Sequence, residues 1–322
     1  MKKEAVTLER IILDTDIGTD ADDVLAVALS VLSPELKVEG ITTVYGDVDL
    51  RARMVVKILK MLGRSDIPVM AGARDTLLRN REIFWLGHEG EGLLTKEDSS
   101  LQYDNRHAVD FIINTVMSNP GEITIIAIGP FTNIAIALAR EPRIAENVKK
   151  IIIMGGSARL GFNAAELEYS DYNVNRDPEA AALLFNSGAP IVMCGYDVTR
   201  QILFREEHIL ALEKTENKLN LAIANMVRIW LRWWNREYTA MNDPLCVAVA
   251  FQPDLCSGMM MNVHVEYDHR HPSGHTICSL PRTPWTPPDE LNIIPPEPKV
   301  MVYLDVDSKR FMNLMLERLC NL

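Results

Sequence analysis

The chain lacks the features of several easily identified protein classes. Its five cysteines include no C-x-x-C pair, so we expect neither a zinc ribbon nor a thioredoxin-like site. No run of 18 apolar residues is present, and the N-terminal MKKEAVTLER has no apolar core of a signal peptide, so no membrane span or secretion signal is expected. Scattered cysteines suit a reducing compartment, which favours a cytoplasmic location.

Basic residues are in the minority. The chain has 33 lysines and arginines against 44 aspartates and glutamates, a net charge of -11. This balance argues against sequence-independent binding to nucleic acid, but it does not exclude a small neutral ligand. Hydrophobic residues make up 48% of the chain, which is enough for a large core. With no internal repeat and no linker, residues 1–322 are expected to form a single domain.

Short apolar runs alternate with helical patterns over the first 200 residues. Strands are expected at 11–13, 38–44, 68–70, 123–128, 148–154 and 191–194, and helices at 22–32, 50–62, 107–117, 132–139 and 178–185. This alternation predicts an α/β fold, with a mostly parallel central sheet and helices on both faces. A C-terminal helical and hairpin elaboration follows: a long helical stretch at about 205–238, a hairpin at 262–268 and 275–278, a strand at 299–304 and a helix at 307–319.

Five carboxylates crowd the end of the first predicted strand and the start of the next helix. So many like charges would repel one another unless they were paired, and oxygen ligands suit a hard cation such as calcium or magnesium. Capping of the helix N-terminus explains one or two acids but not five. Ligands of open parallel sheets bind outside the carboxyl ends of the strands, where this cluster falls. Its members are Asp14, Asp16, Asp20, Asp22 and Asp23.

Two enzyme families have a first strand of this kind. The nucleophile loop of haloacid-dehalogenase phosphatases is similar to Asp14-Thr-Asp16, but Ile17 is then an extra residue. The segment DTDIGTDADD resembles, without a gap, the fingerprint of the inosine-uridine preferring nucleoside hydrolases. Further segments resemble motifs of the second family, in the right order: TTVYGD at 42–47, HEGEGL at 88–93, IGPFTN at 128–133, MGG at 154–156, DYNVNRDPEAA at 171–181 and NDP at 242–244.

This resemblance implies a nucleoside-hydrolase-like fold and hydrolysis of the N-glycosidic bond of ribonucleosides to ribose and free base. It also implies a Ca²⁺ ion at the bottom of a pocket, held by Asp16, Asp23, Asp243 and the backbone carbonyl of Thr132. A calcium-bound water would attack the anomeric carbon, with Asp16 as the catalytic base. The ribose hydroxyls would be held by substrate-binding residues, namely Asp22, Asp171 and Asn173, with Asn163 at the 5′-hydroxyl.

The sequence departs from the family pattern around the leaving base. Members that prefer inosine and uridine have a histidine as general acid where this chain has Asn242, which donates a hydrogen bond but is no acid. Asp47 occupies the position of a usual asparagine, and acid at that place is seen among purine-specific members. His88, in the HEGEGL segment, is a candidate catalytic residue. The preferred base therefore stays open.

Trp230 and Trp234 are four residues apart and share one face of a predicted helix. Their indoles either pack in the core or stack on the nucleobase, and stacking would help a purine to depart without an acid. Two alternative functions remain beside the hydrolase. Asn242 is compatible with a non-catalytic nucleoside- or ribose-binding protein, and Asp14 is the nucleophile that a magnesium-dependent phosphatase would use. Members of the hydrolase family are commonly homodimers or homotetramers, which the resemblance extends to this chain.

Overall fold

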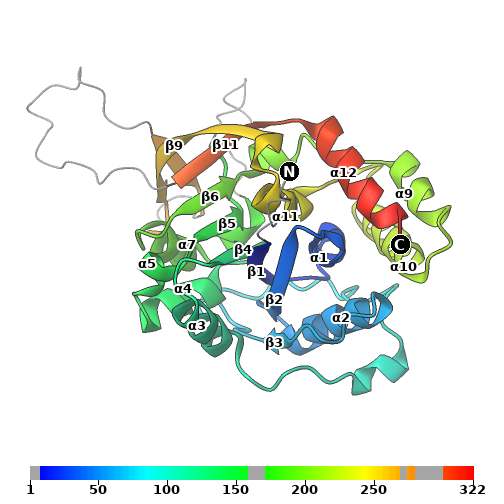
Figure 1. Cartoon of the computed structure of the whole chain (residues 1–322), viewed down its shortest axis with the longest axis horizontal. Coiled ribbons are helices and arrows are strands. Elements are labelled where there is room, and N and C mark those ends of the chain that lie inside the picture. The colour runs from blue at the N-terminus through cyan, green and yellow to red at the C-terminus, as the bar shows by residue number, and fades with distance from the viewer. Residues whose placement is uncertain (1–7, 159–170, 269–273, 280–299) are drawn as a thin grey trace, which may run out of the picture.

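A computed structural model of the chain describes residues 8–158, 171–268, 274–279 and 300–322. Its centre is a sheet of nine strands in the order β10-β9-β11-β6-β5-β4-β1-β2-β3 (Figure 1). The strands from β11 to β3 are parallel, whereas β9 pairs antiparallel with both β11 and β10. The bounds are β1 Glu9–Thr15, β2 Leu36–Thr43, β3 Val69–Ala71, β4 Ile123–Ala127, β5 Lys150–Met154, β6 Ile191–Cys194, β9 Cys256–Val265, β10 Thr276–Ser279 and β11 Val300–Val306.

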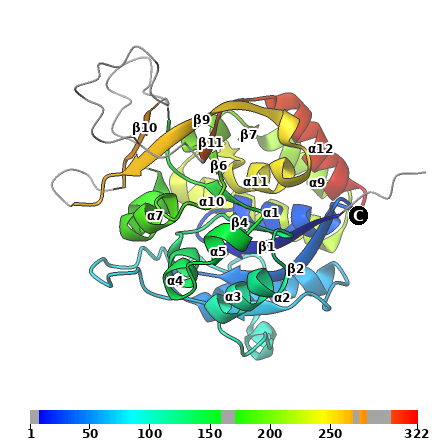
Figure 2. The ribbon, with the colours of Figure 1, turned by 60° about the vertical axis from the view of Figure 1, so that its left-hand side comes forward.

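Helices cover both faces of the sheet, as the alternating pattern predicts (Figures 1 and 2). Within β1, Ile11 and Leu13 join one buried apolar cluster, while Ile12 joins the cluster on the opposite face. One face carries α1 Asp22–Leu32, α2 Val48–Met61, α9 Glu206–Glu213, α10 Lys218–Trp234, α11 Asn242–Phe251 and α12 Ser308–Cys320. The other face carries α3 Ala108–Ser118, α4 Thr132–Arg140, α5 Ile144–Asn147, α6 Tyr172–Arg176 and α7 Pro178–Phe185.

Most expected elements are present with small shifts at their ends. The first strand of the expected hairpin begins earlier, at Cys256 rather than 262, and pairs with β11 as well as β10, and one long helical stretch is divided. The predicted helical stretch at about 205–238 consists of two helices, α9 and α10. Glu216 between them has a φ of 53°, which a helix does not tolerate, and the Asn217 side chain accepts a hydrogen bond from the Leu219 amide at 2.9 Å to begin α10. A short helix, α8 Tyr196–Thr199, and a two-stranded sheet of β7 Leu203–Phe204 and β8 Thr239–Ala240 complete the fold.

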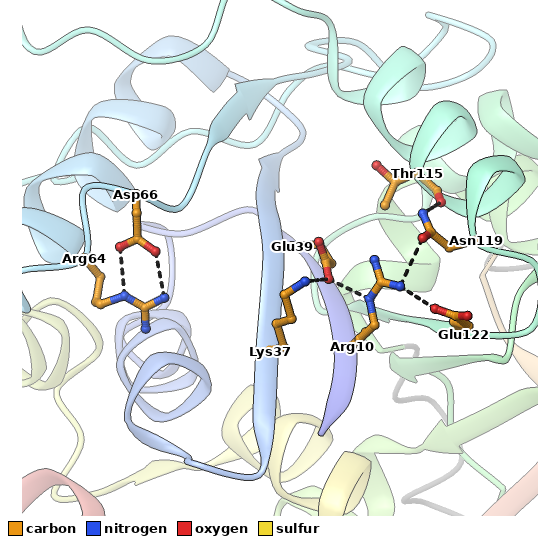
Figure 3. Close-up of polar contacts among 8 residues, drawn as sticks. All are labelled: Arg10, Lys37, Glu39, Arg64, Asp66, Thr115, Asn119 and Glu122. Carbon is orange, nitrogen blue, oxygen red and sulfur yellow. Dashed lines mark hydrogen bonds and ion pairs between the residues drawn. The ribbon is translucent and has the colours of Figure 1, made fainter. Parts of the chain in front are cut away.

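Ion pairs and hydrogen bonds connect residues at the amino ends of β1, β2 and β4 (Figure 3). Arg10, at the start of β1, donates to Glu39 on β2 at 2.7 Å and to Asn119 at 3.0 Å, and also contacts Glu122. Lys37 adds a second ion pair to Glu39 at 2.8 Å. Charges of both signs therefore balance at this end of the sheet. No helix among the described residues is long and apolar enough to cross a membrane.

Candidate active site

A cavity of about 350 Å³ lies at the carboxyl ends of the parallel strands. The loops that follow β1, β4 and β5 and the first turns of α1, α6 and α11 supply its walls. Two classes of side chain line most of it. The acidic class is Asp16, Asp20, Asp22, Asp23, Asp171 and Asp243, and the aromatic class is Phe84, Tyr172, Tyr196, Trp230 and Trp234.

Three of the carboxylates form a group with the geometry of a cation site. One ligand oxygen from each of Asp22, Asp23 and Asp243 lies within 4.8 Å of the others, and all three residues are buried. Burial raises the pKa of Asp243, and repulsion from Asp22 and Asp23 adds to that rise. Buried charges of one sign at this spacing are unfavourable without a counter-charge, so the group fits a metal ion with a preference for oxygen.

Asp16 lies beside this group, on the loop between β1 and α1. Burial raises its pKa to about 6, and the Arg51 guanidinium opposes that rise. Arg51 is fully buried and donates to the carbonyls of Ile17 and Tyr45, each at 2.7 Å, and also to the Asp16 carbonyl. A single side chain thereby fixes the acidic loop. Sequence reasoning missed Arg51, although an arginine on the apolar face of the helix at 50–62 was a usable signal.

Asp14 is buried behind the cavity and does not line it. Its carboxylate accepts hydrogen bonds from the Thr42 hydroxyl at 2.5 Å and the Asn133 amide at 2.7 Å. Burial raises its pKa to about 7. An aspartate held in this way joins β1 to β2 and α4, and it is not placed as the exposed nucleophile that a phosphatase of the haloacid-dehalogenase type requires.

Asn242 lines the cavity, and its polar groups are engaged by the protein. Its amide oxygen accepts a hydrogen bond from the Thr199 hydroxyl at 2.7 Å, and its backbone N–H donates to Asp22 Oδ2 at 2.9 Å. The Asp243 N–H donates to the same oxygen at 3.1 Å. Burial raises the pKa of Asp22, while hydrogen bonds from these two N–H groups and from the Asn242 side chain act in the opposite direction. Asn242 therefore joins α8 to the acidic group.

Asp171 and Asn173 stand on the wall formed by α6. Asp171 caps this helix by accepting from the Val174 N–H at 2.8 Å, and burial raises its pKa to about 6. The Asn173 amide donates to the carbonyls of Ile128 at 3.0 Å and Met154 at 3.1 Å, which follow or end β4 and β5. Both side chains reach the cavity beside the acidic group, as the sequence leads one to expect of ribose-binding residues.

Two residues that the sequence assigns to the site lie elsewhere. Thr132 is in the first turn of α4, where the helix uses its carbonyl, and its hydroxyl donates to Asp177 at 2.6 Å. Ile128 lines the cavity instead, and its carbonyl accepts a hydrogen bond from the cavity residue Asn173 at 3.0 Å. Asp47 caps α2 by accepting from the Leu50 N–H at 3.0 Å and does not line the cavity.

His88 also lies outside the main cavity. It is buried in a small adjoining space with Asp20 and Trp230, and its ring centroid is 5.2 Å from that of Trp233. In this position it does not reach a base in the main cavity. Asn163 lies outside the described residues.

The indoles of Trp230 and Trp234 line the cavity at the end of α10, with ring centroids 6.4 Å apart. Trp234 is 44% exposed, so core packing does not account for it. Sequence reasoning missed the other aromatic residues of the cavity and Arg176, because they come from α6, α8 and the loop of Phe84, which no local pattern brings together. The cavity thus combines an acidic floor whose geometry fits a metal ion with a wall suited to a planar ring.

Known proteins are similar to this chain in both sequence and fold. The model of the inosine-uridine preferring nucleoside hydrolase family matches residues 11–313. The pyrimidine-specific ribonucleoside hydrolase RihA of Citrobacter koseri is 31% identical over 318 residues, covering 96% of this chain and 97% of that protein. The structure of a plant nucleoside hydrolase is 29% identical with a TM-score of 0.85, covering 97% of this chain and 99% of that one. A purine-preferring ribonucleoside hydrolase from Gardnerella vaginalis is 30% identical with a TM-score of 0.83, covering 97% and 98%. The chain therefore belongs to the inosine-uridine preferring nucleoside hydrolase family and is an enzyme that hydrolyses ribonucleosides.

Proposed function

We propose that this enzyme cleaves the N-glycosidic bond with a calcium-bound water. The observation that carries the proposal is the group of buried carboxylates at the cavity floor, none of which forms an ion pair with a described lysine or arginine. Asp22 Oδ2 already accepts two backbone hydrogen bonds, so we assign the ion to Asp16, Asp23, Asp243 and the Ile128 carbonyl. Calcium accepts six to eight oxygens, which leaves positions for two ribose hydroxyls, whereas magnesium usually keeps several waters.

The residues of the cavity have distinct roles in this proposal. The bound ion would polarise a water molecule and neutralise the acidic floor. Asp16 accepts the proton of the attacking water, because its carboxylate lines the cavity beside the acidic group. Asp22, Asp171 and Asn173 accept hydrogen bonds from the ribose hydroxyls, Asn173 through its amide oxygen because its N–H groups already donate to the Ile128 and Met154 carbonyls. Carboxylates on this side also stabilise the positive charge that develops on the sugar.

The base occupies the aromatic side of the cavity in this proposal, against Trp230 and Trp234. The named relatives include both a pyrimidine-specific and a purine-preferring enzyme. A wall of indoles stacks on either kind of ring, so ribonucleosides as a class are the proposed substrates. A binding-only function gains no support, because Asp16 and the acidic group stand together at one cavity. Assembly as a homodimer or homotetramer and a cytoplasmic location stay predictions.

The test is release of reducing sugar from a panel of purine and pyrimidine ribonucleosides, with calcium or with a chelator. We expect release that the chelator abolishes, and Asp16→Asn to lower the rate by about a thousandfold, the upper range for a general base and metal ligand. Asp47→Asn is the matched control, since it makes the same change outside the cavity and retains a capping side chain. Calcium-independent release, or equal rates in both variants, would contradict the proposal.

A further inference from the structure

Arg176 is the only lysine or arginine that lines the cavity among the described residues. Its guanidinium carbon lies 4.5 Å from the ring centre of Phe84 and 4.6 Å from that of Tyr172. No ion pair or hydrogen bond holds it within the described part of the chain, and its Nε is buried without a partner. The side chain is therefore held by aromatic faces, and no acceptor in the described ranges receives a hydrogen bond from its N–H donors.

This arrangement is unusual for a cation in an acidic cavity. Six aspartates line the same cavity, yet none of them forms an ion pair with Arg176. Two aromatic faces stabilise the guanidinium without using its N–H groups. Arginine also stays charged at any physiological pH and presents its donors in a fixed plane. The cavity thus holds a preorganised, permanently charged hydrogen-bond donor that has no partner among the described residues.

Arg176 lies on the same wall as the residues assigned to ribose. It is the last residue of α6 and follows Asn173 by three positions, which places the two side chains on one face of that helix. Asn173 lines the floor next to Ile128, and Arg176 stands beside Phe84 and Tyr172 in the aromatic part of the cavity. Arg176 lines the same cavity as Trp230 and Trp234, so a base held against the two indoles shares this space with the guanidinium.

The chemistry of the reaction identifies the missing partner. When the glycosidic bond breaks, its electron pair moves to the base, which becomes negatively charged unless a donor assists it. Asn242 is no acid, and Thr199 and Asp22 already engage its side chain. His88 does not line the main cavity. Neither residue is placed to assist the departing base.

We propose that Arg176 donates a hydrogen bond to the nucleobase as it departs and thereby stabilises its developing negative charge. This proposal rests on nucleoside hydrolysis at this cavity. The C1′–N bond breaks with its electron pair going to the base, a water oxygen bonds to C1′, and the water proton goes to Asp16. Arg176 transfers no proton, so the base takes its proton from solvent after it leaves.

The test compares substrates that differ only in their need for leaving-group assistance. A ribonucleoside has a poor leaving group, whereas the phenolate of 4-nitrophenyl β-D-ribofuranoside leaves without a donor. Arg176→Met removes the charge and donors but keeps a long side chain that packs on aromatic rings. We expect kcat/KM of the best nucleoside to fall by about a hundredfold, as for loss of one preorganised donor. The nitrophenyl riboside should lose less than about threefold.

Two further variants keep the result interpretable. Arg200→Met is the matched control, because Arg200 also stacks on a cavity tyrosine, Tyr196, at 6.0 Å but does not itself line the cavity. This variant should cleave both substrates at the wild-type rate. Arg176→Lys keeps the charge without the planar fork and should recover part of the nucleoside activity. Equal losses on both substrates, or no loss on the nucleoside, would overturn the proposal. A wild-type enzyme inactive on both substrates would instead contradict the proposed function.

Discussion

The acidic floor makes a prediction in which one substitution has opposite effects with and without metal. Replacing Asp243 by Asn removes one charge from three carboxylates whose oxygens lie within 4.8 Å. At that distance each pair of charges repels by about 3 kcal/mol for an effective dielectric constant near 20. Asp243 faces two such charges, but its raised pKa means that protonation already relieves part of the repulsion. A net gain of about 3 kcal/mol in the free energy of unfolding of the metal-free protein is therefore expected.

The assay is thermal unfolding of both proteins at pH 7.5, first in chelator and then with increasing calcium. For a chain of this length about 3 kcal/mol corresponds to about 4 °C in melting temperature, so metal-free Asp243→Asn should melt higher than the wild type. Calcium at about a hundred times its Kd should add about 2.7 kcal/mol to the wild type and little to the variant. The exposed exchange Asp75→Asn serves as control. A metal-free variant that melts lower than the wild type, or equal calcium shifts in both, would refute the reasoning.

Three other predictions follow from the geometry of the cavity. Trp234→Ala should lower kcat/KM for nucleosides by about tenfold through lost stacking on the base. The melting temperature should not change, because the indole is half exposed. A fall in melting temperature without a loss of activity would instead indicate core packing. Thr199→Val leaves the Asn242 amide oxygen unpaired and should raise KM several-fold, as one lost hydrogen bond of about 1 kcal/mol predicts, whereas an unaltered KM would contradict this link. The pKa values of Asp171 and Asp14 are raised to about 6 and about 7. Because the folded state then holds more protons than the unfolded state, these groups should make the metal-free protein lose stability as pH rises from about 4 to about 7, measurable by unfolding at several pH values.

The order of strands and helices was predictable because it depends on local patterns. Continuous apolar strands such as Ile151 to Ile153 and helical spacing over 22–32 predict a parallel sheet covered on both faces, which the structure shows. The break at Glu216 was not predictable, since nothing in its neighbourhood marks a positive φ. The family was also determined by the sequence, because its motifs are short segments in a fixed order.

The acidic part of the site was likewise encoded locally. Asp16, Asp22 and Asp23 follow one strand within eight residues, so any fold that buries that strand brings them together at its end. Asp243 comes from the far end of the chain, and only the resemblance pointed to it. The structure brings its N–H to Asp22 across 221 positions.

Only the tertiary structure decided which side chains face the cavity. Asp47 and His88 occupy the motif positions that suggested a role, but one caps α2 and the other is buried behind Trp230. Arg176 belongs to the motif segment at 171–181, in which the resemblance pointed to Asp171 and Asn173 but not to Arg176. Its placement depends on contact with Phe84, which lies on a loop distant in sequence. A motif fixes the order of residues along the chain, whereas the direction of each side chain depends on the packing of elements that no local pattern relates. The sequence by itself therefore determined the family and the acidic floor, whereas the fold decided the hydrogen-bond partners of Asn242 and the position of Arg176 in the cavity.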